Sequence, residues 1–396
     1  MKPKVWLLFL IFGLLTLPLL IHLRATTQAP DTTTQRVIPE QKQSSPVPQQ
    51  GQKAVVDLAF CVDTTGSMSG LIEGAKAKIW SIVNTVASGN PRPTLRIGLV
   101  AYRDLNDSYV TRVFDFTSNL ETMYSQINSL QADGGGDEPE HVNRALHEAV
   151  HALSWTNNTG ALKILYLVGD APPHMDYRDG YDYRTVTKTA ARSGIIINTI
   201  QCGSIQATQP VWQEVAKLAQ GKYAMIDQSG GMAHISSPYD GELDRLSREL
   251  NTTYVAYGRE GAASLAEQEG HDKDAALKAP EAAAERAAAK AGSLYKNESW
   301  DLVDGVRENV VNLAETPAAE LPPAMQSMSL EEQKTFIAEK QEQRARLQNQ
   351  IQELSNKRDV YVADEREKSG AEDGFDQQVL STLKEQGKKK GIEFKD

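Results

Sequence analysis

Short apolar runs alternate with amphipathic segments through the middle of the chain. The runs predicted as strands are Ala54–Cys61, Leu95–Tyr102, Tyr109–Phe116, Leu162–Val168, Ile195–Ile200 and Tyr223–Ile226. Between them, segments such as Leu71–Val86 repeat apolar residues at the spacing of a helix face, which predicts helices. Strands that alternate with helices indicate an α/β fold with a doubly wound, mainly parallel sheet. We expect this domain to occupy residues 54–258.

The strongest hydrophobic signal lies ahead of this domain, in residues 1–24. Lys2 and Lys4 precede an uncharged run from Val5 to Ile21. A run of this length fits a single-pass membrane anchor, with a cleaved signal segment as the alternative. Either way we expect the bulk of the protein on the periplasmic or extracellular side, held at the cell membrane or secreted. Residues 25–53 are rich in Thr, Gln, Pro and Ser, which predicts a flexible linker.

Residues 259–396 are predicted to form an α-helical extension. Pro280–Ala291 is alanine-rich, Leu294–Leu313 has apolar residues at helical spacing, and Ser329 precedes a long helix that reaches about Ala363. A stripe at alternating steps of four and three along that helix consists of Leu347, Ile351, Leu354, Arg358 and Tyr361. Such a stripe is typical of a coiled-coil seam, although it covers only about two heptads. The alternative is one arm of a helical hairpin packed on its neighbours or on the preceding domain.

Composition excludes some partners and some kinds of site. The chain has 42 basic and 52 acidic residues and a formal net charge of -10, whereas a surface that binds nucleic acid needs clustered Lys and Arg. We therefore expect no nucleic-acid partner. Two cysteines are too few for a disulfide scaffold or a Cys-rich metal site.

Side chains that carry oxygen follow the predicted strands. Asp63, Thr65 and Ser67 form a D-x-T-x-S turn after the first strand, Asp137 lies in a glycine-rich loop, and Asp170 follows the fourth strand. In an open α/β sheet the ligand crevice lies beyond the carboxyl ends of the strands. Carboxylates and hydroxyls favour a hard cation, so we expect a divalent-cation site, for Mg²⁺ first, with Mn²⁺ or Ca²⁺ as alternatives.

Four motifs follow one another in the order found in a known domain family. They are DTTGSM, AYRD, GGGDEPE and GDAPPH, beginning at Asp63, Ala101, Gly134 and Gly169. In this set the chain resembles the von Willebrand factor type A (VWA) domain, in particular the A domains of alpha-kinase-associated proteins and related bacterial proteins. The polar helical C-terminal region does not resemble a kinase domain. The resemblance therefore implies the fold and a metal-ion-dependent adhesion site, and not kinase activity.

That resemblance also implies how the site acts. Asp63, Thr65, Ser67 and Asp170 match the family's metal ligands, which leave one position of the cation open for an Asp or Glu carboxylate of a partner protein. The family usually has Thr in the second loop, and Asp137 takes that place here. A third carboxylate should bind the metal more tightly and attract an acidic partner less. The alternative is that Asp137 only caps the helix that follows.

The family's strand order bears on the two cysteines as well. It separates the strands of Cys61 and Cys202 by another strand, and strands two apart are about 9–10 Å from each other. A disulfide needs Cα atoms within about 7 Å. We expect two buried free thiols.

The function we expect is cation-dependent protein–protein binding or scaffolding at the cell envelope, without enzymatic activity. One alternative is a zinc-dependent hydrolase, because His147 and His151 spell H-E-x-x-H, although the apolar stripe of their helix turns both to solvent. Another is a structural scaffold that binds no metal. The insert Met175–Tyr183, with three Tyr and three Asp, is either a solvated lid or a contact surface for the partner.

Overall fold

A computed structural model describes residues 54–370 and 374–395 of the chain. The anchor or signal segment expected at 1–24 and the linker expected at 25–53 lie outside the described residues. Within the described ranges, none of the helices combines the length and the apolar character that crossing a bilayer requires.

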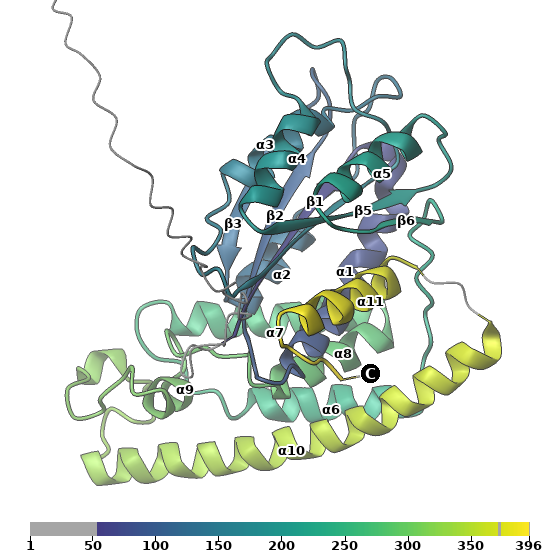
Figure 1. Cartoon of the computed structure of the whole chain (residues 1–396). Helices are drawn as coiled ribbons and strands as arrows, with labels where there is room; N and C mark the ends of the chain where they lie inside the picture. Colours follow the sequence, from purple (N-terminus) through teal and green to yellow (C-terminus); the bar gives the residue numbers. More distant parts are fainter. Residues whose placement is uncertain (1–53, 371–373, 396) are drawn as a thin grey trace, which may run out of the picture. The chain divides into compact units, whose positions relative to one another are not determined.

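A six-stranded sheet forms the centre of the α/β domain, as the alternating pattern predicts (Figure 1). The strands are β1 (Val55–Asp63), β2 (Thr94–Tyr102), β3 (Thr111–Thr117), β4 (Leu162–Gly169), β5 (Ile195–Cys202) and β6 (Tyr223–Ile226). Their order is β3-β2-β1-β4-β5-β6, and β3 alone is antiparallel to its neighbour. Because the other strands run in one direction, their carboxyl ends meet at one edge, which we call the loop end of the sheet.

Helices cover both faces of the sheet. One face carries α3 (Val142–His151), α4 (Tyr183–Arg192) and α5 (Thr208–Leu218), and the other carries α1 (Ser69–Ala87) and α2 (Leu120–Asn128). Successive residues of a strand point to opposite faces. Cys61 of β1 accordingly packs under α3, while Phe60 belongs to the cluster that includes α1. This burial on both sides explains why β1 is apolar along most of its length.

The C-terminal helices share their core with the α/β domain. They are α6 (Asp240–Asn251), α7 (Gly261–Lys278), α8 (Pro280–Ala291), α9 (Leu302–Arg307), α10 (Leu330–Ser369) and α11 (Phe375–Lys389). Helix α8 packs against α1 and α6, and α11 lies beside α1 and contacts β4 and β5 (Figure 1). Ile351 of α10 and Val379 of α11 belong to the same apolar cluster as Phe60. The predicted boundary at residue 258 is thus a change in composition across which the core continues.

Helix α10 begins where the sequence predicts. The Ser329 N–H donates to Glu332 Oε2 at 2.7 Å and the Glu332 N–H donates to Ser329 Oγ at 3.4 Å, which is a capping box. The helix extends beyond Ala363 to Ser369. Ile351, from the predicted stripe, is fully buried, and α10 packs on α6 and α8. The stripe therefore packs against other helices of the same chain, which agrees with the alternative to a coiled coil.

The prediction of one helix over Leu294–Leu313 is wrong. Only α9 is helical in that stretch, because the Asp301 carboxylate accepts from the Asp304 N–H at 2.9 Å and so caps a helix that begins at Leu302. Asn309 then takes a left-handed conformation, with φ of 59°, which ends the helix. Apolar spacing alone gives no sign of these two backbone events.

Both cysteines are free and buried, as predicted. Strand β4 lies between β1, which carries Cys61, and β5, which carries Cys202. Burial raises the pKa of both thiols, which keeps them protonated and unreactive.

Candidate metal centre

Backbone hydrogen bonds hold the turn after β1 against two other segments. The Thr64 N–H donates to the Tyr102 carbonyl of β2 at 2.9 Å, and the Gly66 N–H donates to the Gly134 carbonyl at 3.2 Å. The Asp133 N–H donates back to the Thr64 carbonyl at 3.1 Å. The turn and the glycine-rich loop are therefore fixed side by side at the loop end of the sheet.

Asp63, Thr65 and Ser67 bring their side-chain oxygens together, as their spacing predicts. Asp63 Oδ1 accepts from the Thr65 N–H at 2.8 Å and from Thr65 Oγ1 at 2.7 Å. Thr65 Oγ1 lies 3.3 Å from Ser67 Oγ. The second carboxylate oxygen, Asp63 Oδ2, is buried and has no hydrogen-bond partner. Because an unsatisfied buried acceptor is costly, this oxygen is suited to a cation.

Asp170 reaches the same place from the end of β4. Gln228 Nε2 donates to Asp170 Oδ2 at 2.7 Å and to the Ser67 carbonyl at 3.3 Å, which ties Asp170 to the first loop. Burial, and after it the charge of Asp170, raises the pKa of Asp63 to about 7. The charge of Asp170 acts on Asp63 in this way because the two carboxylates lie near each other.

Glu140 is a third carboxylate of this group, and the sequence analysis did not assign it. The residue is buried, and its Oε2 atom has no hydrogen-bond partner. A Cβ atom added to Gly135 would lie 3.3 Å from Thr65 Cβ and 3.5 Å from Glu140 Oε1, so a glycine separates the two side chains. Burial, and after it the charge of Asp63, raises the pKa of Glu140 to about 9.

Asp137, which the sequence analysis placed in this group, lies elsewhere. Its side chain is 63% exposed, and its Oδ2 atom is 3.4 Å from His174 Nε2. The chain instead presents Glu140, because the Glu140 N–H donates to the Pro172 carbonyl at 3.0 Å and the Glu140 carbonyl accepts from the His174 N–H at 3.1 Å. The signal in the sequence was the position of Glu140 at the end of GGGDEPE, next to the start of α3.

Within the described residues, the charge of this group is not offset by an ion pair. We call Asp63, Thr65, Ser67, Glu140 and Asp170 the Asp63 centre. Of the ion pairs in the described part of the chain, none involves its three carboxylates. The nearby Arg103 directs Nη1 to Asp133, at 3.7 Å, and Nε to the Thr64 carbonyl, at 3.1 Å. Carboxylate and hydroxyl oxygens in this arrangement fit a hard divalent cation.

Comparison with known protein families identifies the domain. Residues 57–237 match the von Willebrand factor A domain. The chain contains a von Willebrand factor A domain. Domains of this family commonly mediate protein–protein interactions and often bind a divalent cation.

The curated relatives match less than a third of this chain. The chain is 34% identical over 122 residues to an ariadne-like RING finger protein of Acanthamoeba polyphaga mimivirus, covering 31% of this chain and 12% of that protein. It is 28% identical over 120 residues to alpha-protein kinase vwkA of Dictyostelium discoideum, covering 30% and 19%. It is 33% identical over 116 residues to von Willebrand factor A domain-containing protein 7 of Homo sapiens, covering 29% and 12%. The chain thus spans less than a fifth of the length of each relative.

Two solved structures are also similar. The SpRpn10 VWA domain is 16% identical with a TM-score of 0.34, and the match covers 44% of this chain and 89% of that one. Proximal thread matrix protein 1 from the mussel byssus is 13% identical with a TM-score of 0.35, and the match covers 44% and 42%.

The two histidines of H-E-x-x-H lie on the side of the VWA domain that the sequence predicts. Helix α3 buries its apolar stripe against the sheet, while His151 is exposed and His147 is partly exposed. The two rings stack with centroids 4.4 Å apart, and the Tyr181 ring contacts the His147 ring edge-on, with centroids 4.9 Å apart. The pair therefore forms part of the surface next to the insert.

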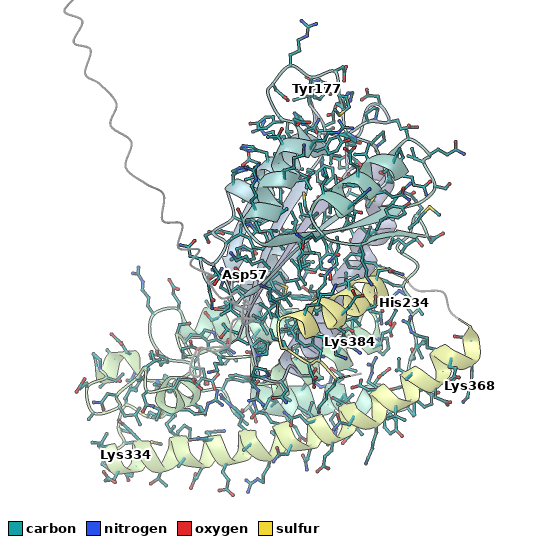
Figure 2. All side chains as sticks on the ribbon, in the orientation of Figure 1. Asp57, Tyr177, His234, Lys334, Lys368 and Lys384 are labelled. Carbon is teal, nitrogen blue, oxygen red and sulfur yellow. The ribbon has the colours of Figure 1, made fainter. Side chains whose placement is uncertain are left out.

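The insert Met175–Tyr183 packs on the rim of the loop end, and Figure 2 shows Tyr177 there. The Tyr177 hydroxyl donates to Asp104 Oδ2 at 2.6 Å, and its ring stacks on His174 at 4.1 Å. Tyr183 is buried and donates to Glu214 Oε2 at 2.7 Å. Together with Tyr181, which contacts His147, all three tyrosines of the insert make contacts within the domain.

Proposed function

We propose that the VWA domain binds a divalent cation at the Asp63 centre and uses it to bind a partner protein. The supporting observation is that two buried carboxylate oxygens, Asp63 Oδ2 and Glu140 Oε2, have no hydrogen-bond partner. The charge of a further carboxylate, Asp170, acts on Asp63 as well. A cation would satisfy both oxygens and relieve the repulsion among the carboxylates. Mg²⁺ is the first candidate because the donors are all oxygens, with Mn²⁺ and Ca²⁺ as alternatives.

Each side chain has a distinct part in this proposal. Asp63 and Asp170 offset the charge of the cation, and Thr65 and Ser67 contribute hydroxyl oxygens. Glu140 adds a third carboxylate, so the loaded centre carries less positive charge than one with a neutral residue there. We propose that an Asp or Glu carboxylate of the partner completes the coordination, against the repulsion of Glu140. The cation is then held tightly and the partner reversibly.

The place of action is part of the proposal and rests on the sequence. The apolar run and the basic residues before it favour export, with residues 1–24 as a membrane anchor or a cleaved signal. The partner is then a protein of the cell envelope. Recognition through a bound cation needs no bond-making step, and we propose no enzymatic activity.

Titration of the full-length chain with Mg²⁺ by calorimetry tests the cation site. Asp63→Asn should abolish Mg²⁺ binding, and Glu140→Gln should weaken it, because each removes a charge that faces the ion. Asp133→Asn is the matched control, since Asp133 lies in the same loop with its side chain 80% exposed and should leave the affinity unchanged. Equal Mg²⁺ affinity in the wild type and Asp63→Asn would refute the site.

Capture of partners from an envelope extract tests the interaction. The wild-type chain should retain a protein in Mg²⁺ and release it in EDTA, whereas Asp63→Asn should retain none under either condition. If both chains retain the same protein in EDTA, the domain acts as a scaffold that needs no metal. That outcome would overturn the proposed mechanism even if Mg²⁺ binds.

A further inference from the structure

Asp104, Asp137 and His174 gather beside the Asp63 centre without belonging to it. Asp104 follows β2, Asp137 lies in the glycine-rich loop, and His174 lies in the loop after β4. One ligand atom from each residue lies within 4.8 Å of the other two. Three separate segments therefore direct a nitrogen and two carboxylates to a common point.

The hydrogen bonding of His174 decides what its ring offers to that point. His174 Nδ1 lies 2.8 Å from Asp176 Oδ1, so the proton of the neutral ring is on Nδ1. The residue is 8% exposed, and Nε2 has no hydrogen-bond partner. The free electron pair of Nε2 thus faces the carboxylates of Asp104 and Asp137. Such a contact is repulsive unless a proton or a metal ion on Nε2 supplies a positive charge.

The distances suit a metal ion better than direct hydrogen bonds. His174 Nε2 is 3.4 Å from Asp137 Oδ2 and 3.6 Å from Asp104 Oδ2. Hydrogen bonds between nitrogen and oxygen are usually about 2.7–3.2 Å. Two ligands that are each about 2.0–2.1 Å from a tetrahedral ion lie about 3.3–3.4 Å apart. The observed spacing is close to that value.

Outer contacts hold the cluster in the manner of metal sites. A ligating histidine commonly donates its other N–H to a carboxylate, and Asp176 occupies that position for His174. The Tyr177 hydroxyl donates to Asp104 Oδ2, and its ring stacks on His174. Asp104 Oδ1 is buried without a partner, which leaves a second oxygen available.

We propose that Asp104, Asp137 and His174 form a second metal site, for a transition-metal dication such as Zn²⁺. An imidazole ligand favours Zn²⁺ over Mg²⁺, whereas the all-oxygen Asp63 centre favours the hard cation. Three protein ligands leave a position open to solvent on the side of Asp137. The ion would tie the glycine-rich loop to the loop after β4. This site does not depend on the function proposed for the Asp63 centre.

The test uses Co²⁺ as a visible probe on the full-length chain, in excess Mg²⁺ so that the Asp63 centre is occupied. The wild type should bind Co²⁺ with the absorption of a nitrogen-ligated ion, and Zn²⁺ should displace it. His174→Gln should weaken binding by about 100-fold, and Asp176→Asn by about 10-fold, because Asp176 only orients the ring. Asp137→Asn removes a ligand at an exposed position and should weaken binding without affecting folding.

Two control variants separate this site from its neighbours. His147 and His151, four residues apart on α3, are a competing place for Co²⁺, and the double variant His147→Gln/His151→Gln should keep the wild-type signal. Asp63→Asn should keep it too. The proposal is overturned if the wild type binds no Co²⁺, if the signal follows His147 and His151, or if Asp137→Asn and His174→Gln bind as the wild type does.

Discussion

The two ends of the sheet bury carboxylates in opposite ways. Beyond the amino ends of the strands, where α6 to α10 pack (Figure 1), the buried carboxylates of Glu121, Asp272 and Asp301 contact arginine side chains. Arg286 contacts Glu121 at 2.7 Å and Asp272 at 2.6 Å, and Arg344 contacts Asp301 at 2.7 Å. At the loop end, Asp63 and Glu140 are equally buried and have no such partner.

This difference distinguishes the buried carboxylates that hold the fold together from those that we expect to bind a ligand. A buried carboxylate with a basic partner holds two segments together, as Arg344 of α10 does when it binds the cap of α9. A buried carboxylate without one lowers stability unless something from outside supplies the charge. The paired end therefore fastens the C-terminal helices, and the unpaired end is where we expect a ligand.

The largest expected effect on stability comes from removing one member of a buried ion pair. Arg344→Ala would leave Asp301 buried without its counter-charge, and Asp304 with only the partly exposed Arg307, at a cost of about 3–5 kcal/mol. Urea unfolding of the full-length chain measures this loss. Arg346→Ala is the matched control on the same helix, because Arg346 is 66% exposed and pairs with the exposed Glu342. Similar losses in the two variants would show that the buried pair does not fasten α10.

The Asp63 centre and Asp272 should respond to pH in opposite directions in EDTA. The folded protein raises the pKa of Asp63 from 3.8 to about 7 and that of Glu140 from 4.5 to about 9. Each group therefore holds its proton more tightly when folded, and stability falls as pH rises through those intervals, by at most about 1.4 kcal/mol per pH unit for each group.

Asp272 provides the contrast. Although burial raises its pKa, the charges of Lys290 and then Arg286 bring the pKa of Asp272 to about 2, below its ordinary 3.8. The ionised Asp272 stabilises the fold fully at pH values above its ordinary pKa of 3.8, and this stabilisation is lost as pH falls towards 2. Urea unfolding from about pH 4 to pH 9 should show a decline that Asp63→Asn reduces and Asp272→Asn does not. Parallel declines in Asp63→Asn and the wild type would contradict the contrast.

The smallest expected effect concerns a neutral contact of α11. The Tyr166 hydroxyl lies 2.7 Å from Thr382 Oγ1 and donates to the Val379 carbonyl at 3.0 Å. Tyr166→Phe keeps the ring and removes these bonds, at a cost of about 1 kcal/mol in urea unfolding. A loss as large as that of Arg344→Ala would mean that neutral hydrogen bonds, and not charge pairs, dominate the fastening of the C-terminal helices.

Local pattern predicted the parts of the fold and site that depend on neighbours in sequence. The strands follow from apolar runs, and the turn from Asp63 to Ser67 from its own spacing. The start of α10 follows from Ser329 and Glu332, which form their cap within one helical turn.

The remaining parts depend on contacts between distant residues. Asp137 and Glu140 carry the same chemical group three positions apart, and hydrogen bonds to Pro172 and His174 decide which of them faces Asp63. Arg344 looks like an ordinary polar position of α10, and only the fold brings it to Asp301, 43 residues away. Pairing of this kind leaves no periodic pattern in the sequence, so neither Glu140 nor the charge pairs of the C-terminal helices could be predicted from it.

The position of α11 has a consequence for the synthesis of the protein. Tyr166 of β4 is bonded to Val379 of α11 across 213 residues of chain. A ribosome that has completed all six strands has still to make the helix that covers Phe60 and Tyr166 on that face. Until α11 is made, Phe60 and Tyr166 lack the part of their cover that this helix provides. A fragment that stops at residue 237, where the family match ends, would retain α1 and α2 on the face that carries Phe60 but would lack the cover of α11.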